Sequence, residues 1–364
     1  LNLAIIIKNK RREDALLNIA QVTKIHSDFY YVKFSDKVYE CKIREILKKS
    51  NKEIFIGDFV KFEITDEKSL TGIIFDIEKR KNFIPRPAVA NLDQIIIISA
   101  IKEPDFDYTQ LDRYLAFANL NNINAIICIN KTDLSSDHQK LSDIKNLYES
   151  LNYKIIDVSA KTKDNLDSLK NILKNKFSVF CGQSGVGKSS LLNAISPNLH
   201  LRVKSVSTKT TRGTHTTRHS EILEINLGAE KASIADTPGF SLLKFDCILP
   251  QNITNLFPDI LEFSSYCRYN NCLHLEEDGC HVKNNLEKIA QSRYKSYKNF
   301  VEEALKYKEK LSKEGNKKET TTKTIDKSQK KIEIAKLGIK KREKSRRFNK
   351  QNLVYEHMED EEHE

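Results

Sequence analysis

The sequence predicts a multidomain protein with an all-β barrel of the OB type, an α/β domain that carries a phosphate-binding loop, and a small, mostly helical metal-binding domain. Short strand patterns with turn residues between them fill the first part of the chain. Strand-length and helix-length apolar runs then alternate, and a cluster of cysteine and histidine follows them. The predicted domains are the barrel at 1–87, the α/β domain at 88–245, the metal-binding domain at 246–304 and a charged tail at 305–364.

The barrel is predicted from short runs in which apolar and polar residues alternate. Five such strands in so few residues are typical of a small barrel; the OB fold is the leading candidate, although an SH3-like barrel has the same periodicity. Pro85-Arg86-Pro87 then interrupts the pattern, and we interpret it as a linker. The predicted strands are Ala15–Ile25, Phe29–Phe34, Val38–Ile43, Asp58–Ile64 and Thr71–Ile77.

The α/β domain is predicted from apolar runs that alternate with helical repeats around Leu111, Ile144 and Leu169. This alternation favours a mostly parallel sheet covered by helices. Because ligands of such sheets bind at the carboxyl ends of the strands, the segments that follow the strands should carry the chemistry. The predicted strands are Leu92–Ser99, Ala125–Ile129, Lys154–Val158, Phe177–Cys181 and Ala232–Ala235.

The segment 182–189 matches the phosphate-loop pattern of two glycines followed by Lys and Ser, and it lies between a predicted strand and a predicted helix. Glycines let the backbone direct N–H groups at phosphates, and the helix start adds partial positive charge. We expect Lys188 to reach the β- and γ-phosphates and Ser189 to bind Mg²⁺. The predicted nucleotide contacts are Gly182, Gln183, Ser184, Gly185, Val186, Gly187, Lys188, Ser189 and Ser190.

Two motifs that follow consecutive strands favour guanine as the base. Residues 130–133 look like the guanine-specificity motif of GTPases, in which Asp133 would accept hydrogen bonds from guanine N1–H and its amino group. Adenine lacks this donor pair, and Asn130 can tie neighbouring loops together. Residues 159–161 resemble the second base-contacting motif of GTPases. The predicted base contacts are Asn130, Lys131, Thr132, Asp133, Ser159, Ala160 and Lys161.

Two further segments resemble the switches of a GTPase. Residues 236–239 (Asp-Thr-Pro-Gly) look like the motif in which Asp holds Mg²⁺ through water and the Gly N–H senses the γ-phosphate. The threonine-rich segment Thr208–Thr217 offers hydroxyl groups for the same ion. The Mg²⁺ ligands are therefore predicted as Ser189, Thr216 and Asp236, and the predicted GTP contacts here are Thr216, Thr217, Asp236 and Gly239.

The order of these motifs predicts a circularly permuted GTPase domain. The guanine motifs at 130 and 159 precede the phosphate loop at 182, whereas in ordinary small GTPases they follow it. A sheet tolerates new chain ends if the old ends lie close enough to be joined. The same pocket is therefore expected from a chain that is cut at another place.

Hydrolysis needs a group that orients the attacking water. The residue after the switch glycine is Phe240, whose ring cannot form a hydrogen bond with water. His215, in the threonine-rich segment, is the candidate catalytic residue because an imidazole can orient water or accept its proton. A solvated loop histidine is an equally good interpretation of the sequence.

A cluster of three cysteines and one histidine predicts a metal site. Cys267-x4-Cys272-x-His274-x5-Cys280 supplies four ligands, which suits one tetrahedral Zn²⁺ with no open position. Such an ion is structural, and because the surrounding segment has little apolar content, we expect the metal to be needed for folding.

The composition bounds the partners. The formal charge of +11 favours a polyanion such as nucleic acid, with solubility alone as the alternative. No window is long and apolar enough to span a membrane, and no signal peptide is recognised, so no membrane partner is expected. The odd, scattered set of seven cysteines fits a reducing cytosol. We interpret the tail either as a polyanion-binding extension or as a solvated segment.

Taken together, residues 15 to about 300 resemble the bacterial ribosome small-subunit-dependent GTPase A family. The resemblance is carried by the permuted motif order, Gly213–Arg218, Phe240, the cysteine-histidine cluster and the closing segment Ser292–Tyr297. It implies an OB barrel that binds rRNA, a permuted GTPase domain and a zinc domain. It also implies a small ribosomal subunit as partner, GTP and GDP as ligands, stimulated GTP hydrolysis, and release of a late assembly factor.

This resemblance leads us to expect a GTP hydrolase that works as a monomer in the cytoplasm. One alternative is an RNA-binding module whose nucleotide pocket regulates binding with negligible hydrolysis. Another is a P-loop ATPase or kinase, which a nucleotide competition assay would separate from a GTPase. The role of the tail does not follow from the resemblance.

Overall fold

The structure is a computed structural model that describes residues 18–45, 47, 52–85, 87–135, 137–199, 221–236, 248–315, 322–327 and 330–335, the last residues from 311 on by their backbone only. The described residues divide into two compact units. The first unit takes those within Leu1–Leu243, Leu256–Glu262 and Asn285–Ser296. The second unit takes those within Lys244–Asn255, Phe263–Asn284 and Tyr297–Glu364.

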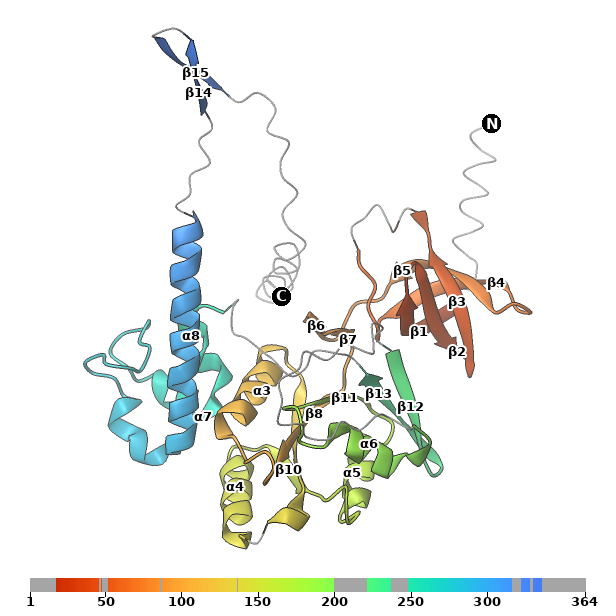
Figure 1. Cartoon of the computed structure of the whole chain (residues 1–364), viewed down its shortest axis with the longest axis horizontal. Helices are drawn as coiled ribbons and strands as arrows, with labels where there is room; N and C mark the ends of the chain where they lie inside the picture. The colour runs from red at the N-terminus through yellow and green to blue at the C-terminus, as the bar shows by residue number, and fades with distance from the viewer. Residues whose placement is uncertain are drawn as a thin grey trace. The chain divides into compact units, whose positions relative to one another are not determined.

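The N-terminal strands close into the predicted five-stranded barrel (Figure 1). The strands are ordered β1-β2-β3-β5-β4, and β4 pairs with β1 to close the barrel. Only β3 and β5 run parallel, which is the arrangement of an OB fold. Val22, Val32 and Phe62 lie fully buried inside because side chains alternate between the two faces of a strand. The strands are β1 (Asn18–His26), β2 (Phe29–Phe34), β3 (Lys37–Ile43), β4 (Phe59–Asp66) and β5 (Thr71–Ile77).

The proline-containing segment after the barrel is not the simple linker that we predicted. Strands β6 (Phe83–Pro85) and β7 (Ala88–Ala90) pair as a short antiparallel hairpin across it. Pro85 can occupy such a strand because the ladder has only two strands, so a missing N–H costs little on the open edge. Ile56 also bridges to Val89, which ties the hairpin to the barrel side of the chain.

The α/β domain contains the predicted parallel sheet. Its strands are ordered β10-β9-β8-β11-β13-β12, and every neighbouring pair from β10 to β13 is parallel. The carboxyl ends of these strands therefore meet at one edge of the sheet, which we name the nucleotide rim. The strands are β8 (Gln94–Ala100), β9 (Asn124–Asn130), β10 (Lys154–Asp157), β11 (Phe177–Cys181), β12 (Glu221–Leu227) and β13 (Glu230–Asp236).

Helices cover both faces of this sheet, with a separate apolar core on each side (Figure 1). Ile95 and Ile97 of β8 join the core under α3 and α4. Ile96 and Ile98 face the opposite way and join the core under α5 and α6. The near-continuous apolar runs of these strands follow from burial on both faces. The helices are α3 (Tyr108–Leu120), α4 (His138–Ser150), α5 (Leu166–Leu173) and α6 (Lys188–Ile195).

Strand β12, which the sequence analysis did not predict, connects the sheet to the barrel. It pairs antiparallel with β13 along its whole length, and Glu221 at its start pairs with Lys24 of β1. The Lys24 ammonium lies 3.3 Å from the Glu221 carboxylate. The barrel and the α/β sheet are thereby joined in one hydrogen-bonded array.

The C-terminal elements are mostly helical, as predicted. Helix α8 extends past residue 304, so the predicted start of the tail falls inside a helix. No described helix is both long enough and apolar enough to cross a membrane. The elements are η3 (Pro250–Asn252), η4 (Thr254–Leu256), α7 (Pro258–Ser264), η5 (Lys283–Lys288), α8 (Gln291–Gly315), β14 (Thr322–Lys327) and β15 (Lys330–Ala335).

A buried ion cluster in the first unit fastens the start of α8 to the α/β domain. The side chain of Arg293 is 1% exposed; its Nη1 lies 2.7 Å from Asp112 Oδ1 of α3, and its Nη2 lies 2.7 Å from Asp259 Oδ1 of α7. The Tyr148 hydroxyl donates to the same Asp112 oxygen at 2.8 Å. Burial raises the pKa of Asp112 despite the neighbouring guanidinium. Loss of the arginine would therefore leave two carboxylates without their cation.

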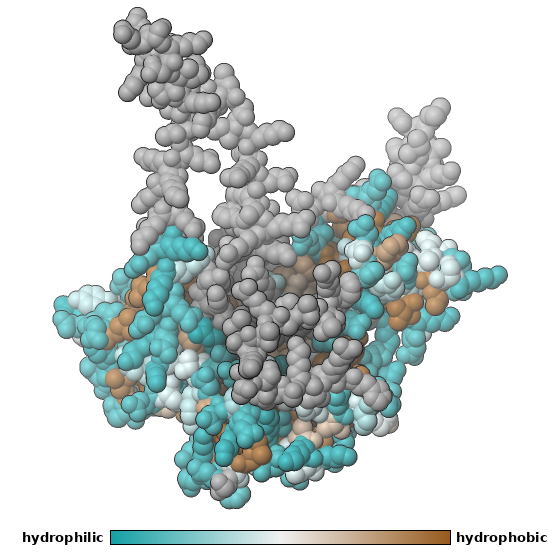
Figure 2. Space-filling view, in the orientation of Figure 1, coloured by the Kyte–Doolittle hydropathy of each residue, from teal (hydrophilic) through white to brown (hydrophobic). Residues whose placement is uncertain are grey.

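The exposed faces are mixed in polarity. On the face shown in Figure 2, hydrophobic side chains of the described residues stand in small groups among hydrophilic ones. Scattered apolar groups of this kind are ordinary on a protein surface and indicate no binding site by themselves.

Candidate nucleotide and metal sites

The phosphate loop is built where the sequence predicted it, between β11 and α6. Gly182, Gly185 and Gly187 all have positive φ angles, of 145°, 88° and 95°. A Cβ at Gly182 would lie 2.2 Å from the Ile98 carbonyl oxygen, and one at Gly187 would lie 2.3 Å from Asn130 Nδ2. Only glycine fits both the backbone conformation and the space at these two positions.

Lys188 and Ser189 form the first turn of α6, at the mouth of the loop. The Lys188 ammonium donates hydrogen bonds to the carbonyl oxygens of Gly182 and Gln183, at 2.7 and 2.8 Å. Burial lowers the pKa of Lys188. The two hydrogen bonds hold the ammonium beside the loop backbone, where the phosphates of a bound nucleotide would pair with its positive charge.

Asn130 joins the phosphate loop to both guanine motifs, as predicted. It is the last residue of β9, and its side chain is 1% exposed. Its Nδ2 donates to the Val186 carbonyl oxygen at 2.9 Å, and its Oδ1 accepts from the Ala160 N–H at 3.1 Å. One amide side chain therefore fixes three loops that are far apart in the sequence at one place on the nucleotide rim.

Asp133 lies next to this junction with a side chain that is 13% exposed. The Ser159 hydroxyl donates to Asp133 Oδ1 at 2.6 Å, and Lys161 Nζ lies 4.0 Å from Oδ2. The Thr132 hydroxyl donates to the Val158 carbonyl oxygen at 3.1 Å. The hydroxyl of Ser159 thus orients the carboxylate through Oδ1.

Lys131 forms a further hydrogen bond between loops on the same rim. Its ammonium donates to the Glu103 carbonyl oxygen, in the loop between β8 and α3. Its backbone adopts a left-handed conformation with φ of 63°. The lysine stem therefore runs beside the phosphate loop, and its Cε lies 4.0 Å from the position of a Cβ on Gly187.

Asp236 ends β13, at the same rim. Val179 pairs with Ala235, so Asp236 follows directly beside the end of β11. Burial and the nearby Glu221 raise the pKa of Asp236. The remaining predicted switch residues, His215, Thr216, Thr217 and Gly239, together with Phe240, lie outside the described residues.

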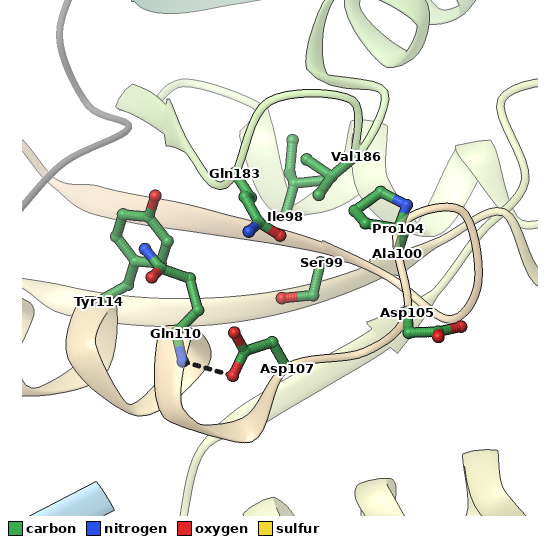
Figure 3. A pocket seen from close by; sticks show the side chains of 10 residues that line it. All are labelled: Ile98, Ser99, Ala100, Pro104, Asp105, Asp107, Gln110, Tyr114, Gln183 and Val186. Atoms are coloured by element: carbon green, nitrogen blue, oxygen red, sulfur yellow. Dashed lines mark hydrogen bonds between the residues drawn. The ribbon is translucent and has the colours of Figure 1, made fainter. Parts of the chain in front are cut away.

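A small hollow of about 240 Å³ lies against one side of the phosphate loop (Figure 3). Gln183 of the loop and Gln110 and Tyr114 of α3 are among the residues that line it. The Asp107 carboxylate accepts the Gln110 N–H at 3.1 Å, which caps α3 at this place. The hollow thus borders the phosphate loop on the side of α3.

The predicted metal ligands come together in the second unit. One donor atom each from Cys267, Cys272, His274 and Cys280 lies within 4.8 Å of all the others. The Cys267 and Cys280 sulfurs are 4.0 Å apart, and each is 3.5 Å from His274 Nδ1. Tetrahedral zinc with bonds of about 2.0–2.3 Å would place its ligand atoms roughly 3.5–3.8 Å apart. The four side chains can therefore hold a metal ion. We call the segment Phe263–Asn284, which carries them, the metal module.

Backbone groups of the metal module also suit a metal. The His281 N–H points at the Cys267 sulfur at 3.3 Å, and the Lys283 N–H points at the Cys280 sulfur at 3.4 Å. Such bonds stabilise thiolates, which are the form that binds metal. Burial lowers the pKa of His274 and so favours the neutral imidazole, which is the ligand form of histidine.

Comparisons with known proteins identify the family. A family profile described as RsgA GTPase matches residues 77–246, and one described as the RsgA N-terminal domain matches residues 20–74. The chain is 41% identical over 287 residues to the small ribosomal subunit biogenesis GTPase RsgA of Geobacillus sp. (strain WCH70), with 78% of this chain and 96% of the relative covered. The chain belongs to the RsgA GTPase family.

A further relative and two solved structures agree with this assignment. The Bacillus subtilis (strain 168) protein of the same name is 39% identical over 292 residues, with 78% of this chain and 96% of the relative covered. The solved structure of YloQ, a circularly permuted GTPase, matches with a TM-score of 0.66 and 35% identity over 80% of this chain and 96% of that chain. YjeQ from Thermotoga maritima matches with a TM-score of 0.68 and 34% identity over 80% of this chain and 99% of that chain.

Membership of the RsgA GTPase family confirms the fold class and the main enzymatic prediction. The protein is a GTP hydrolase that combines an OB-type barrel, a circularly permuted GTPase domain and a small, mostly helical domain with a metal-binding cluster. The family favours hydrolysis over the alternative of an RNA-binding module with negligible turnover.

Two features of these sites were missed by the sequence analysis of this RsgA GTPase family member. Glu277 accepts the N–H groups of Leu273 and Leu275 at 2.7 and 2.8 Å, on either side of a metal ligand. No spacing rule distinguishes it from the neighbouring Glu276. The tie between Lys131 and the Glu103 carbonyl oxygen joins side chain to backbone, and such a contact leaves no pattern in sequence.

Proposed function

We propose that this GTPase acts in late maturation of the small ribosomal subunit, where it binds rRNA and couples GTP hydrolysis to the release of an assembly factor. Relatives that match this chain over nearly their whole length are named small ribosomal subunit biogenesis GTPases. The basic charge of +11 suits an RNA partner. We further propose that the protein works as a monomer in the cytoplasm.

One observation carries the nucleotide part of this proposal: the two hydrogen bonds of Asn130, to the phosphate loop and to the second guanine motif. They support a single pocket in which Asp133 accepts the guanine N1–H and amino group while Lys188 meets the phosphates. The proposed GTP contacts are the residues 130–133, 159–161 and 182–190, with Thr216, Thr217, Asp236 and Gly239 from the switches.

The residues also fit Mg²⁺. Ser189 at the start of α6 and Asp236 at the end of β13 are oxygen donors on the same rim, and oxygen is what this hard cation prefers. The raised pKa of Asp236 indicates a carboxylate that a nearby cation would stabilise. We assign Ser189, Asp236 and Thr216 as its protein contacts. When bound, the ion would neutralise charge on the β- and γ-phosphates.

His215 is proposed to orient the attacking water. Phe240 occupies the place after the switch glycine and has no group that can hold water, so another side chain must serve. We expect His215→Ala to abolish hydrolysis that is stimulated by ribosomal subunits while GTP affinity stays within about 2-fold. Unchanged stimulated turnover would exclude this role.

The outer face of the barrel supports RNA binding. Lys42 Nζ lies 5.4 Å from the centre of the Phe29 ring, and the Arg44 guanidinium lies 5.1 Å from the centre of the Phe75 ring. The two cations are exposed, and the buried Cys41 between strands β2 and β5 marks the opposite, inner face. Half-buried rings on β2 and β5 beside exposed cations of β3 and the residue after it suit bases and phosphates of single-stranded RNA.

The barrel proposal is tested by the double variant Lys42→Ala with Arg44→Ala. Its affinity for an rRNA fragment should fall. The slope of the logarithm of the binding constant against the logarithm of the salt concentration should become less steep by about 0.7 for each lost phosphate contact. The exposed lysines Lys68 and Lys79 of the same domain provide a control pair with the same change in charge. Equal losses in both double variants would indicate only a general charge effect.

The metal-binding cluster is proposed to hold one structural Zn²⁺. Four protein ligands leave no position for a substrate, and three sulfurs with one imidazole are a zinc donor set. We also propose the division into a barrel at 1–87, a GTPase domain at 88–245, a zinc domain at 246–304 and a charged tail at 305–364.

The whole proposal is tested by GTP hydrolysis with purified ribosomal subunits added. Small subunits should raise turnover at least about 10-fold, because a partner must complete the catalytic site. Large subunits at the same concentration serve as the control and should leave turnover unchanged. Equal turnover with and without small subunits would contradict the proposed partner.

A further inference from the structure

We infer that Glu277 is a positioning residue of the metal site: its carboxylate clamps the backbone on both sides of His274 and so aims the imidazole at the three sulfurs. This inference rests on the proposed zinc site. Glu277 acts through the ligand and does not itself bind the ion.

The geometry of the clamp is complete on both sides of the ligand. Glu277 Oε1 accepts the Leu273 N–H at 2.7 Å, and its Oε2 accepts the Leu275 N–H at 2.8 Å. Burial by itself would raise the pKa of Glu277, but these backbone hydrogen bonds outweigh burial and lower it. A carboxylate with both oxygens bound to N–H groups is fixed in place and has charge-assisted bonds, which are the stronger kind.

His274 needs such a clamp because of its backbone. Its φ is 56°, in the left-handed region that a residue other than glycine rarely adopts. A conformation of this kind persists only when the surroundings hold it. Without the two hydrogen bonds the segment would relax toward ordinary conformations, and the imidazole would leave the position where its Nδ1 is 3.5 Å from two sulfurs.

A third contact holds the same peptide from the other side. The Tyr297 hydroxyl donates to the Leu273 carbonyl oxygen at 3.0 Å and lies 3.0 Å from the Thr254 hydroxyl. Both side chains are buried, and the Tyr297 ring lies beside the His274 ring at 5.9 Å between centres. The N–H and the carbonyl of Leu273 are therefore both held by side chains. Among the described residues, Glu277 alone accepts the N–H groups on both sides of His274.

The neighbouring Glu276 offers a matched control. Its side chain is 96% exposed, and its carboxylate lies 3.5 Å from Lys283 Nζ. Glu276→Gln removes one negative charge near the metal, as Glu277→Gln does, but it removes no hydrogen bond to the segment that bears His274. The pair separates the positioning effect from the effect of charge.

The experiment measures the affinity of the full chain for Zn²⁺ by competition with a chromophoric chelator. We expect Glu277→Gln to weaken affinity by about 10- to 100-fold, the usual effect of losing a residue that orients a metal ligand. Glu277→Asp, whose shorter carboxylate reaches one N–H at a time, should lie between Glu277→Gln and the wild type. Glu276→Gln should change affinity by less than about 2-fold.

Co²⁺ spectra provide the second readout. Saturated Glu277→Gln should show the same sulfur-to-metal and ligand-field bands as the wild type, reached at a higher Co²⁺ concentration, because the ligands themselves are unchanged. Shifted bands would indicate that Glu277 is a ligand and would overturn the inference. Unchanged Zn²⁺ affinity in Glu277→Gln, or an equal loss in Glu276→Gln, would also overturn it.

Failure of the proposed zinc site would look different. A wild-type chain that takes up no Zn²⁺ would overturn the zinc site and this inference together. Tight binding by the wild type with no effect of Glu277→Gln would overturn the inference alone.

Discussion

The nucleotide rim and the metal module hold their functional groups in opposite ways. At the rim, strands such as β11 are buried along their whole length, and helices on both sides enclose two apolar cores. Asn130 and Lys188 are then fixed by hydrogen bonds to loop backbone. In the metal module, four side chains that can bind a metal ion converge, and backbone N–H groups point at two of the sulfurs.

This difference teaches where stability comes from in each region. The rim rests on buried apolar surface, which stabilises it whether or not a ligand is bound. The buried side chains of the metal module are three of the four predicted ligands and Val282, so the cation should supply its folding free energy.

Removal of zinc should give the largest effect, and it should be confined to the metal module. Structural zinc contributes about 10–16 kcal/mol of apparent binding free energy in small zinc domains. A strong chelator should therefore abolish amide-exchange protection in Phe263–Asn284 while Phe177–Ile195 keeps its protection. Retained protection in the metal module after metal removal would show that its apolar contacts suffice.

Arg293→Met should destabilise the first unit independently of zinc. Breaking a buried ion pair typically costs about 3–5 kcal/mol, because the remaining charges stay buried without a partner. Here Asp112 and Asp259 would both remain. Urea unfolding should show this loss with and without a chelator. Lys24→Ala, which breaks an exposed pair, should cost no more than about 1 kcal/mol.

Gly187→Ala should weaken GTP binding through the phosphate loop. The added Cβ would lie 2.3 Å from Asn130 Nδ2 at a φ of 95°. Strain of about 1–3 kcal/mol corresponds to roughly 5- to 150-fold in affinity. Gly228→Ala is the control, since its φ is 81° but a Cβ there meets nothing within 4 Å. It should leave GTP affinity unchanged; an equal loss there would mean that backbone strain anywhere in the domain has this effect.

The sequence predicted most of the site because its motifs follow strands. The register of a parallel sheet brings Asn130, the phosphate loop and Asp236 to one rim, so local patterns were enough to place them. All five strands of the barrel also lie within a few residues of their predicted bounds. The division into domains and the catalytic role of His215 stay predictions.

Other features depend on partners that no local pattern reveals. Arg293 meets Asp112 from 181 residues away, and a lone arginine in a polar helix looks like a solvated one. Strand β12 was missed as well; it pairs with β13 along its length and meets the barrel at Glu221. The hairpin across Pro85 was missed because proline usually ends a strand, and here the open edge tolerates it.

We propose that Asp133 faces the base in the same pocket in which Lys188 faces the phosphates. The affinities of the wild type and Asp133→Asn for GTP and for xanthosine triphosphate test this arrangement. Xanthine replaces the amino group by a carbonyl, which an asparagine amide can meet with its N–H.

We expect the wild type to prefer GTP and Asp133→Asn to prefer xanthosine triphosphate. Loss of charge-assisted bonds of about 1.5–3 kcal/mol each should weaken GTP binding by at least roughly 10-fold. Gly228→Ala, which lies away from the rim, should keep the wild-type preference. An Asp133→Asn variant that binds GTP as tightly as the wild type would contradict the claim.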